Sequence, residues 1–395
     1  MDIRDIRDIR DVRDVRDIDE IGDIRISVAV MHHPRRADRL PRLVRSCAPL
    51  RPRVVTDPDP SGPPSPLRTA KRAWAAVAPG ATHHLVLQDD VTLTPGFAGL
   101  LNGAVAQRPR HAIALYSNWN SPQNSYHVRR AAAAGSPWAP LSPAEWTPTQ
   151  GLVLPADQAR ELAEFLAPIP DAIRDDDEMV ALFCAERGIR PLATVPHLVD
   201  HADEPTLAGH AGSFHATVYA DGQALPPGHW TAGPGAEEAL GARSAHRDAR
   251  EFVVELIRSR CMLRFVRPGS GEPVEHGFGW YWADWASVAG IDPARVRDEF
   301  HAYARRDGVG APYAPEVWAA GYLLGADAAA SGAAGTMAGT VRARLLRDAV
   351  GSWIDSGLRP ADRLTLGPAG RAALTELGVA AVERGRAATR LLVRA

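Results

Sequence analysis

The chain has 395 residues, with 45 Lys and Arg residues against 47 Asp and Glu residues, and 45% of its residues are hydrophobic. This composition is typical of a soluble globular protein, and the length favours two domains. The formal net charge of −2 gives no electrostatic reason to expect nucleic acid or an anionic membrane as a partner. No stretch approaches the roughly 18 consecutive apolar residues that a transmembrane helix needs.

The cysteines and the N-terminus both favour a cytoplasmic location. Cys47, Cys184 and Cys261 are far apart and odd in number, so they offer neither a disulfide framework nor a paired zinc motif. Residues 1–24 repeat Asp-Ile-Arg or Asp-Val-Arg instead of showing a signal peptide. A period of three gives no straight apolar stripe on a helix of 3.6 residues per turn. We interpret residues 1–24 as a low-complexity tail and assign it no function.

Strand and helix patterns alternate between residues 25 and 207. Apolar runs predict strands at 26–31, 54–57, 84–87, 111–116 and 190–195, and helical spacing predicts helices at 37–47, 65–77, 95–106, 155–166 and 175–187, with an irregular stretch at 117–148. This order predicts an α/β, Rossmann-like domain with a mostly parallel sheet flanked by helices. A ligand is expected beyond the carboxyl ends of the strands.

The second half of the chain has a different pattern. Residues 208–245 lose periodicity and gather Gly and Pro, which predicts a linker or lid. Amphipathic spacing near 247–260, 293–305, 315–329, 339–355 and 368–384 predicts a mainly α-helical domain over residues 246–395. The aromatic group at 280–285 is interpreted as part of its core. The role of this domain is open, and a protein partner is one hypothesis.

The strongest chemical signal is Gln88-Asp89-Asp90 at the end of the strand at 84–87. Two adjacent carboxylates at the end of a buried strand repel each other and resist desolvation unless a cation neutralises them. Mg²⁺ or Mn²⁺ binds one or two carboxylates and fills its other positions with phosphate oxygens and water, which suits a diphosphate ligand. The alternative is that both aspartates only cap the following turn.

The order of motifs over residues 26–201 resembles the GT-A glycosyltransferases, particularly families 2 and 25. The matching segments are the strand at 26–31, Asp57 after the second strand, the helix carrying Arg68 and Lys71, the acidic motif at 88–90, Thr149-Gln150-Gly151-Leu152-Val153-Leu154-Pro155, Arg174-Asp175-Asp176-Asp177-Glu178, and Pro196-His197-Leu198-Val199-Asp200-His201. The resemblance implies a GT-A-like fold that binds a nucleotide-diphosphate sugar. It covers about half of the chain.

The resemblance also implies roles for the first group of residues. Asp90 matches the metal-binding aspartate of the family's DxD-like motif, with Asp89 beside it. Gln88 stands where most relatives have an acidic residue, and its amide can bind a ribose hydroxyl without adding charge. Asp57 matches an acidic residue that contacts the nucleotide base. Arg68 and Lys71, at spacing i, i+3, would reach the diphosphate, or else form a solvated helix face.

The second group of residues would serve the acceptor and the metal. The family places its acceptor-activating carboxylate near Asp176 and Asp177, although the whole acidic run is also explained by its favourable place at a helix N-terminus. His201 matches a histidine metal ligand of some relatives and suits Mn²⁺, or is a hydrogen-bonded loop residue. Trp119 and Asn120 follow a strand and offer a stacking surface and sugar-type hydrogen bonds, although a Trp packed in the core is an equal alternative.

These observations predict a glycosyltransferase that moves a sugar from a nucleotide-diphosphate sugar to an acceptor hydroxyl with Mn²⁺ or Mg²⁺. The metal and the basic pair would stabilise the departing diphosphate. Two alternatives stay open: a metal-dependent phosphohydrolase, and a non-catalytic module that binds nucleotide sugars or a protein. The sequence leaves the sugar, the acceptor, the stereochemical outcome and the oligomeric state open.

Overall fold

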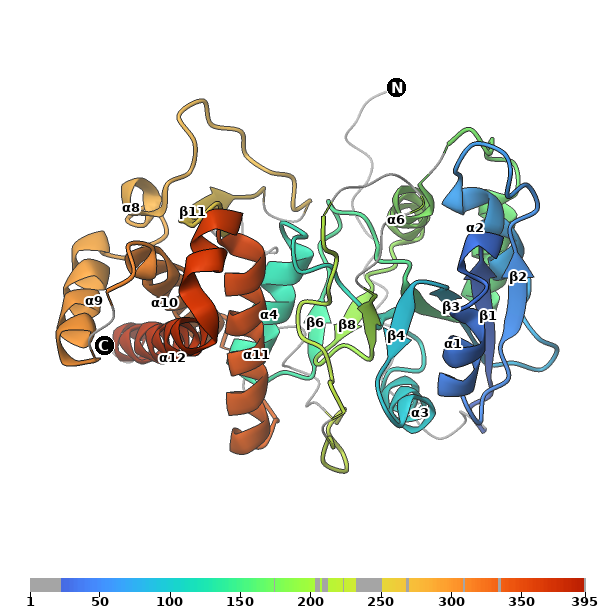
Figure 1. The fold of residues 1–395 in the computed structure, drawn as a ribbon, viewed down its shortest axis with the longest axis horizontal. Helices are drawn as coiled ribbons and strands as arrows, with labels where there is room; N and C mark the ends of the chain where they lie inside the picture. The colour runs from blue at the N-terminus through green and yellow to red at the C-terminus, as the bar shows by residue number, and fades with distance from the viewer. Residues whose placement is uncertain are drawn as a thin grey trace, which may run out of the picture.

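A computed structural model describes residues 23–173, 175–202, 207, 212–222, 224–231, 251–267, 270–307, 310–332 and 335–393. Nearly all of the predicted tail and residues 232–245 of the predicted linker lie outside these ranges. The described part is α/β, with a central sheet, flanking helices and a helical C-terminal region (Figure 1). No helix in these ranges combines the length and apolarity that a membrane crossing requires.

Seven strands in the described residues form the central sheet, in the order β2-β1-β3-β7-β5-β8-β6. They are β1 (Ile26–His32), β2 (Arg53–Thr56), β3 (His83–Gln88), β5 (Ile113–Ala114), β6 (Trp138–Pro140), β7 (Gly151–Pro155) and β8 (Leu192–Thr194). The pairings give β1, β2, β3, β5 and β8 one direction, and β7 and β6 the opposite direction. The expectation of an α/β fold with a mostly parallel sheet is therefore confirmed.

The two faces of β1 pack against different helices because successive side chains of a strand point to opposite faces. Ala29 and Met31 share a hydrophobic cluster with residues of α2 (Pro66–Trp74), α5 (Ala156–Leu166) and α6 (Asp176–Arg187). Val28 and Val30 share a second cluster with residues of α1 (Leu40–Ser46) and α3 (Phe97–Gln107). The sheet is thus covered on both sides, which explains its continuous apolar runs.

Parallel pairing aligns the carboxyl ends of the first three strands. Met31 lies opposite Gln88, and His32 lies opposite Thr56. The residues that follow β1, β2 and β3 therefore meet at one edge of the sheet. A second small sheet, β4 (Val91–Leu93) with β9 (Val199–His201), pairs Val91 with His201 beside this edge.

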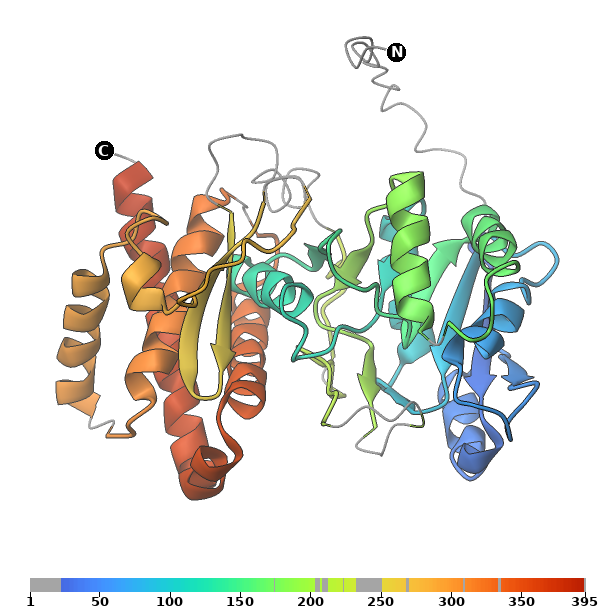
Figure 2. The ribbon, with the colours of Figure 1, turned by 90° about the horizontal axis from the view of Figure 1, so that it is seen from above.

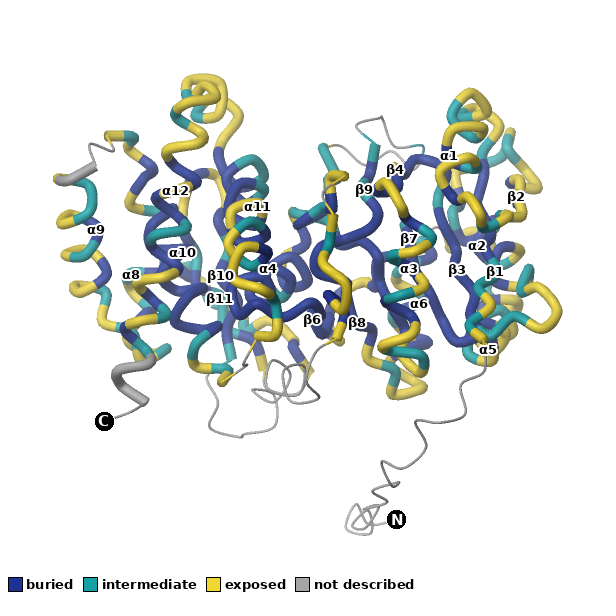
Figure 3. Tube along the Cα trace, turned by 90° about the horizontal axis from the view of Figure 1, so that it is seen from below, coloured by how far each residue is buried: buried dark blue, intermediate teal, exposed yellow. Residues whose placement is uncertain are grey.

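The expectation of an irregular stretch at 117–148 is wrong, because it contains α4 (Asn124–Ala134) and β6. All but one residue of α4 is buried, so the helix has no polar face that amphipathic spacing would reveal (Figure 3). Its buried Arg129 donates to Ser125 Oγ at 2.6 Å and to the Ala349 carbonyl at 3.2 Å. The same guanidinium lies 5.2 Å from the centroid of the Trp353 ring. Tertiary packing therefore determines this helix.

The C-terminal half begins with a β-hairpin, where a helix at 247–260 was expected. Strands β10 (Phe252–Ile257) and β11 (Arg260–Phe265) are antiparallel, and their turn has positive φ angles of 49° at Arg258 and 62° at Ser259. The expected helix is wrong because a short apolar run rich in β-branched residues fits a strand as well. The other expected helices are present, as α9 (Pro293–Asp307), α10 (Ala314–Ala330), α11 (Gly339–Gly357) and α12 (Pro360–Val393, kinked at Gly367), and the short α8 (Trp282–Trp285) precedes them.

Helix α4 lies between the sheet and the C-terminal helices (Figures 1 and 2). One hydrophobic cluster runs from Val86 of β3 through α4 to Leu345 of α11. Tyr126 of α4 donates to Asp327 Oδ2 of α10 at 2.5 Å. The division near residue 245 stays a prediction, and the described core is continuous across it.

Part of the predicted linker or lid packs tightly on the sheet half. Thr217 and Val218 are buried, and His197 forms an isolated parallel bridge with Tyr219. Trp230 packs against Trp138, with ring centroids 5.5 Å apart. The segments 212–222 and 224–231 are therefore structural parts of the first half.

Helices α10 and α12 approach so closely that a side chain at Gly325 would overlap the backbone carbonyl of Val382. We therefore expect Gly325→Ala to reduce the free energy of unfolding by about 3 kcal/mol, because a backbone contact cannot relax as a side chain can. Gly99→Ala in α3 is the control, since nothing lies within 4 Å of its added methyl group. Chemical denaturation measures both, and equal stability of the two variants would contradict the close contact.

Candidate functional site

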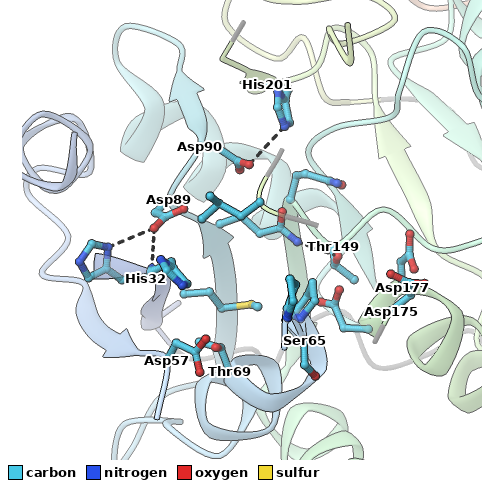
Figure 4. Close-up of a pocket in the computed structure, with 18 of the residues that line it drawn as sticks. His32, Asp57, Ser65, Thr69, Asp89, Asp90, Thr149, Asp175, Asp177 and His201 are labelled. Carbon is cyan, nitrogen blue, oxygen red and sulfur yellow. Dashed lines mark hydrogen bonds and ion pairs between the residues drawn. The ribbon is translucent and has the colours of Figure 1, made fainter. Parts of the chain in front are cut away.

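A cavity of about 700 Å³ opens at the carboxyl ends of β1, β2 and β3. Its walls come from the segments after these strands, the Pro-rich loop before α2, residues 146–150 and the start of α6. Figure 4 shows Asp89, Asp90 and His201 on one side, and Thr149, Asp175 and Asp177 on the other. Ligand sites of α/β proteins lie at this edge of the sheet. The cavity is therefore the candidate site.

Asp89 holds the segment that follows β1. Its Oδ2 accepts hydrogen bonds from the His33 backbone N–H at 2.7 Å and pairs with His32 Nδ1 at 3.1 Å. Its Oδ1 accepts from Arg36 Nη1 at 3.0 Å. Both carboxylate oxygens of this buried residue are engaged by the protein itself, so Asp89 positions the loop and its neighbours.

The two carboxylate oxygens of Asp90 differ in their contacts. Its Oδ2 lies 2.8 Å from Arg36 Nη1 and 3.2 Å from His201 Nε2. Its Oδ1 is buried and has no hydrogen-bond partner among the described residues. Burial opposes ionisation of Asp90, but His201 and Arg36 together hold its pKa below the ordinary value. Asp90 is therefore an anion that lines the cavity, and one of its two oxygens has no partner among the described residues.

His201 is fixed by the pairing of β4 with β9. Its Nδ1 lies 2.6 Å from the Ala202 carbonyl oxygen, and its Nε2 faces Asp90. Burial lowers the pKa of His201, but the hydrogen bond and charge of Asp90 outweigh that effect and raise it. The structure thus brings together the two residues that the sequence predicted as metal ligands.

Asp57 and Arg68 form a bidentate ion pair on the cavity wall. Arg68 Nε donates to Asp57 Oδ1 at 2.7 Å, and Nη2 donates to Oδ2 at 2.8 Å. The bond to Arg68 is the main cause of the lowered pKa of Asp57, against the effect of burial. Because the guanidinium is engaged in this pair, Arg68 supports the Asp57 carboxylate instead of standing open for a diphosphate.

Lys71 does not line the cavity, although it lies on the same helix as Arg68. Its ammonium group is bonded to the Ile169 carbonyl and lies 2.7 Å from Asp171 Oδ1. Lys71 therefore connects α2 to the segment between α5 and α6. The structure does not bring it together with the other predicted site residues.

Gln88, Thr149 and Asp176 form a polar line across the cavity. Gln88 Nε2 donates to Thr149 Oγ1 at 3.2 Å. Burial, reinforced by the charge of Asp177, raises the pKa of Asp176 to about 7, and the hydrogen bond with Thr149 acts in the opposite direction. Asp176 Oδ2 is buried without a hydrogen-bond partner in the described residues.

The other two aspartates of this run have different positions. Burial raises the pKa of Asp177 to about 6. Its Oδ1 accepts from the Glu178 N–H at 2.9 Å within the first turn of α6. Asp175 is the N-cap residue of α6, the position that the sequence favoured for it. Asp176 is thus the most buried carboxylate of the three and retains an unbonded oxygen.

Trp119 and Asn120 face different cavities. Asn120 lines the main cavity, and its Nδ2 donates to the Ser213 carbonyl at 3.2 Å. Trp119 donates to the same carbonyl at 2.9 Å and lines a second cavity of about 440 Å³ with Asp200 and His215. The structure therefore separates the two residues that were predicted to bind the acceptor.

Several residues that line the cavity had no site role predicted from the sequence, among them His32, Arg36, Trp146 and Thr149. His32 and Arg36 contact the Asp89–Asp90 pair. Parallel pairing of the strands at 26–31 and 84–87 would have predicted these contacts, because it brings the end of β1 beside Asp89. Trp146 lines the cavity and is 40% exposed, so it presents an aromatic face there. No local pattern distinguished Trp146 from Trp119.

The cavity is acidic, and an acidic lining favours the binding of a divalent cation. Its lining includes seven carboxyl groups and three guanidinium groups. No group of three or more His, Cys, Asp or Glu side chains in the described ranges is arranged to hold a metal. Asp90 and His201 alone still fit one, because Mg²⁺ and Mn²⁺ complete their coordination with phosphate oxygens and water. The Asp90 carboxylate and His201 Nε2 are the protein groups that such an ion would use.

Comparison of the sequence with protein-family models and with curated proteins gives no match. The functional assignment therefore depends on the residues of the cavity. Three features carry chemical information: the Asp90 carboxylate beside His201, the acidic lining, and the buried Asp176 with a pKa of about 7.

The raised pKa of Asp176 has a measurable effect on stability. The folded chain prefers protonated Asp176, so this preference stabilises it below about pH 4 and is lost as pH rises towards about 7. We expect Asp176→Asn to melt a few degrees above the wild type at about pH 8, with a smaller difference at about pH 5. Glu164→Gln, at an exposed position on α5, is the control and should show no such difference. Equal curves for wild type and Asp176→Asn at both pH values would exclude a buried ionisable Asp176.

Proposed function

We propose that the chain is a glycosyltransferase that moves a sugar from a nucleotide-diphosphate sugar to an acceptor hydroxyl with the help of Mn²⁺ or Mg²⁺. The observation that carries the proposal is the arrangement of two different carboxylates around one cavity. Asp90 is ionised and faces His201, whereas Asp176 is buried with a pKa of about 7. Carboxylates with separated pKa values are typical of sites that combine electrostatic stabilisation with proton transfer.

The acidic lining supports the need for a divalent cation. A diphosphate is anionic, and carboxyl groups outnumber guanidinium groups in this cavity. The Asp90 carboxylate and His201 would hold the ion, and when bound it would neutralise charge on the departing diphosphate. Arg35 and Arg36 add positive charge at the same edge of the cavity.

The nucleoside would lie along the ends of β2 and β3. Asp57, held rigid by its bidentate bond to Arg68, offers acceptor oxygens to a base or ribose. The Gln88 amide, bonded to Thr149, can bind a ribose hydroxyl without adding charge. Lys71 has no part in this proposal, because its ammonium group is bonded to Asp171 outside the cavity.

Asp176 would act as the general base in a direct displacement. Its carboxylate takes the proton of the acceptor hydroxyl while that oxygen bonds to the anomeric carbon and the carbon–diphosphate bond breaks. Its Oδ2 has no hydrogen-bond partner among the described residues and would accept that proton. Asn120 and the exposed ring of Trp146 provide a hydrogen-bonding group and a stacking surface for the acceptor.

The first test is ligand binding. We expect one nucleotide-diphosphate sugar of a panel to raise the melting temperature in the presence of Mn²⁺, because a ligand at 100 times its Kd stabilises by about 2.7 kcal/mol. Asp90→Asn should lose this shift, and Glu164→Gln should keep it.

Product analysis then separates the enzyme classes. Transfer releases nucleoside diphosphate, whereas a phosphohydrolase would release nucleoside monophosphate without an acceptor. Binding with neither product would favour the non-catalytic module.

The second test identifies the base by its pH dependence. If Asp176 is the base, kcat/KM should fall about tenfold per pH unit below about pH 7. Asp177→Asn should move this limb to lower pH, because the charge of Asp177 contributes to the raised pKa of Asp176. Asp176→Asn should lose transfer and keep donor binding. Loss of transfer in Asp177→Asn, with activity kept in Asp176→Asn, would assign the base to Asp177 instead.

A further inference from the structure

The two adjacent aspartates are neutralised by an arginine of the chain itself. Arg36 Nη1 lies 3.0 Å from Asp89 Oδ1 and 2.8 Å from Asp90 Oδ2. The Arg36 side chain is 13% exposed, and both carboxylates are buried. A single guanidinium thus bridges two carboxylates that would otherwise repel each other in a partly desolvated cavity.

This bridge is unequal, because the two aspartates differ in their other partners. Asp89 also accepts from the His33 backbone and pairs with His32, so it remains bound to the β1 loop without Arg36. In the part of the chain that the structure describes, Asp90 Oδ2 is contacted by Arg36 and His201, and its Oδ1 has no partner. The Arg36–Asp90 contact is therefore the exchangeable half of the bridge.

We propose that Arg36 is a built-in counter-cation that a divalent ion must displace from Asp90, and that the released guanidinium then pairs with the phosphates of the ligand. The proposal rests on the metal-dependent function proposed above. An ion of charge +2 binds carboxylate oxygen at about 2.1 Å and attracts it more strongly than one guanidinium at 2.8 Å. Arg36 lines the cavity, so the displaced group stays where an anionic ligand enters.

Two consequences follow from this exchange. Without a ligand, Arg36 and the ion compete for one carboxylate, so the chain alone binds the ion weakly. With a diphosphate present, the displaced guanidinium gains an anionic partner, so ion and diphosphate bind with positive coupling. The arrangement discriminates against an ion that arrives without its phosphate ligand.

The test measures Mn²⁺ alone, by the loss of the free-ion signal in electron paramagnetic resonance, on the full chain. We expect Arg36→Ala to bind Mn²⁺ at least tenfold more tightly than the wild type. Arg36→Gln should show the same gain while keeping an N–H donor near Asp89, which covers the case in which Arg36→Ala does not fold. Arg35→Ala is the matched control, because it removes one exposed guanidinium from the same cavity, and the described contacts of Asp90 do not include Arg35.

Three outcomes decide the proposal. A gain in Arg36→Ala or Arg36→Gln, with little change in Arg35→Ala, supports displacement. Equal gains in the Arg36 and Arg35 variants would reduce the effect to general charge and overturn it. Weaker or absent Mn²⁺ binding in both folded Arg36 variants would also overturn it. Binding of nucleotide-diphosphate sugars, followed separately by thermal shift, shows whether the proposed function fails as well.

Discussion

The parallel pairing of β1 with β3 is the constraint on which the site depends. This register sets Met31 beside Gln88, so the segment after β1 arrives at the two aspartates after β3. It delivers the His33 N–H, the His32 ring and the Arg36 guanidinium to carboxylates that would otherwise be buried without compensation. The pairing of β4 with β9 then adds His201 from the end of the first half. The strand pairing therefore determines which groups compensate the buried charges of Asp89 and Asp90.

Helix α4 has a comparable role between the two halves. It is buried on nearly all sides, and it carries Arg129 and Tyr126 into contacts with α11 and α10. Burial lowers the pKa of Arg129 to about 9, a cost that neutral oxygens and the Trp353 ring offset. Such a polar core specifies how the helices pack, because each buried donor requires its own acceptor. The C-terminal helices thus complete the core of the chain.

Much of the fold was predictable from the sequence, because apolar periodicity reports directly which face of an element is buried. It identified the strands β1, β2 and β3 and the helices α5, α9 and α11. It failed at α4, which is buried all round, and at β10 and β11, where a short apolar run suits either structure. Adjacency in the sequence pointed to Asp89 and Asp90. Arg36 was missed because its role depends on strand pairing, and Lys71 was misjudged because helical spacing does not show which acceptor a long side chain reaches.

The two cavities share a wall that consists of two chain segments lying side by side. Asn118 and Phe214 line the larger cavity, whereas the next residues, Trp119 and His215, line the smaller one. The segments are joined by the hydrogen bond from the Trp119 N–H to the His215 carbonyl at 2.9 Å and by the edge-to-face contact of their rings. These contacts hold the two segments side by side as one partition. A displacement of this partition towards one cavity enlarges the other, so the volumes on its two sides are geometrically linked.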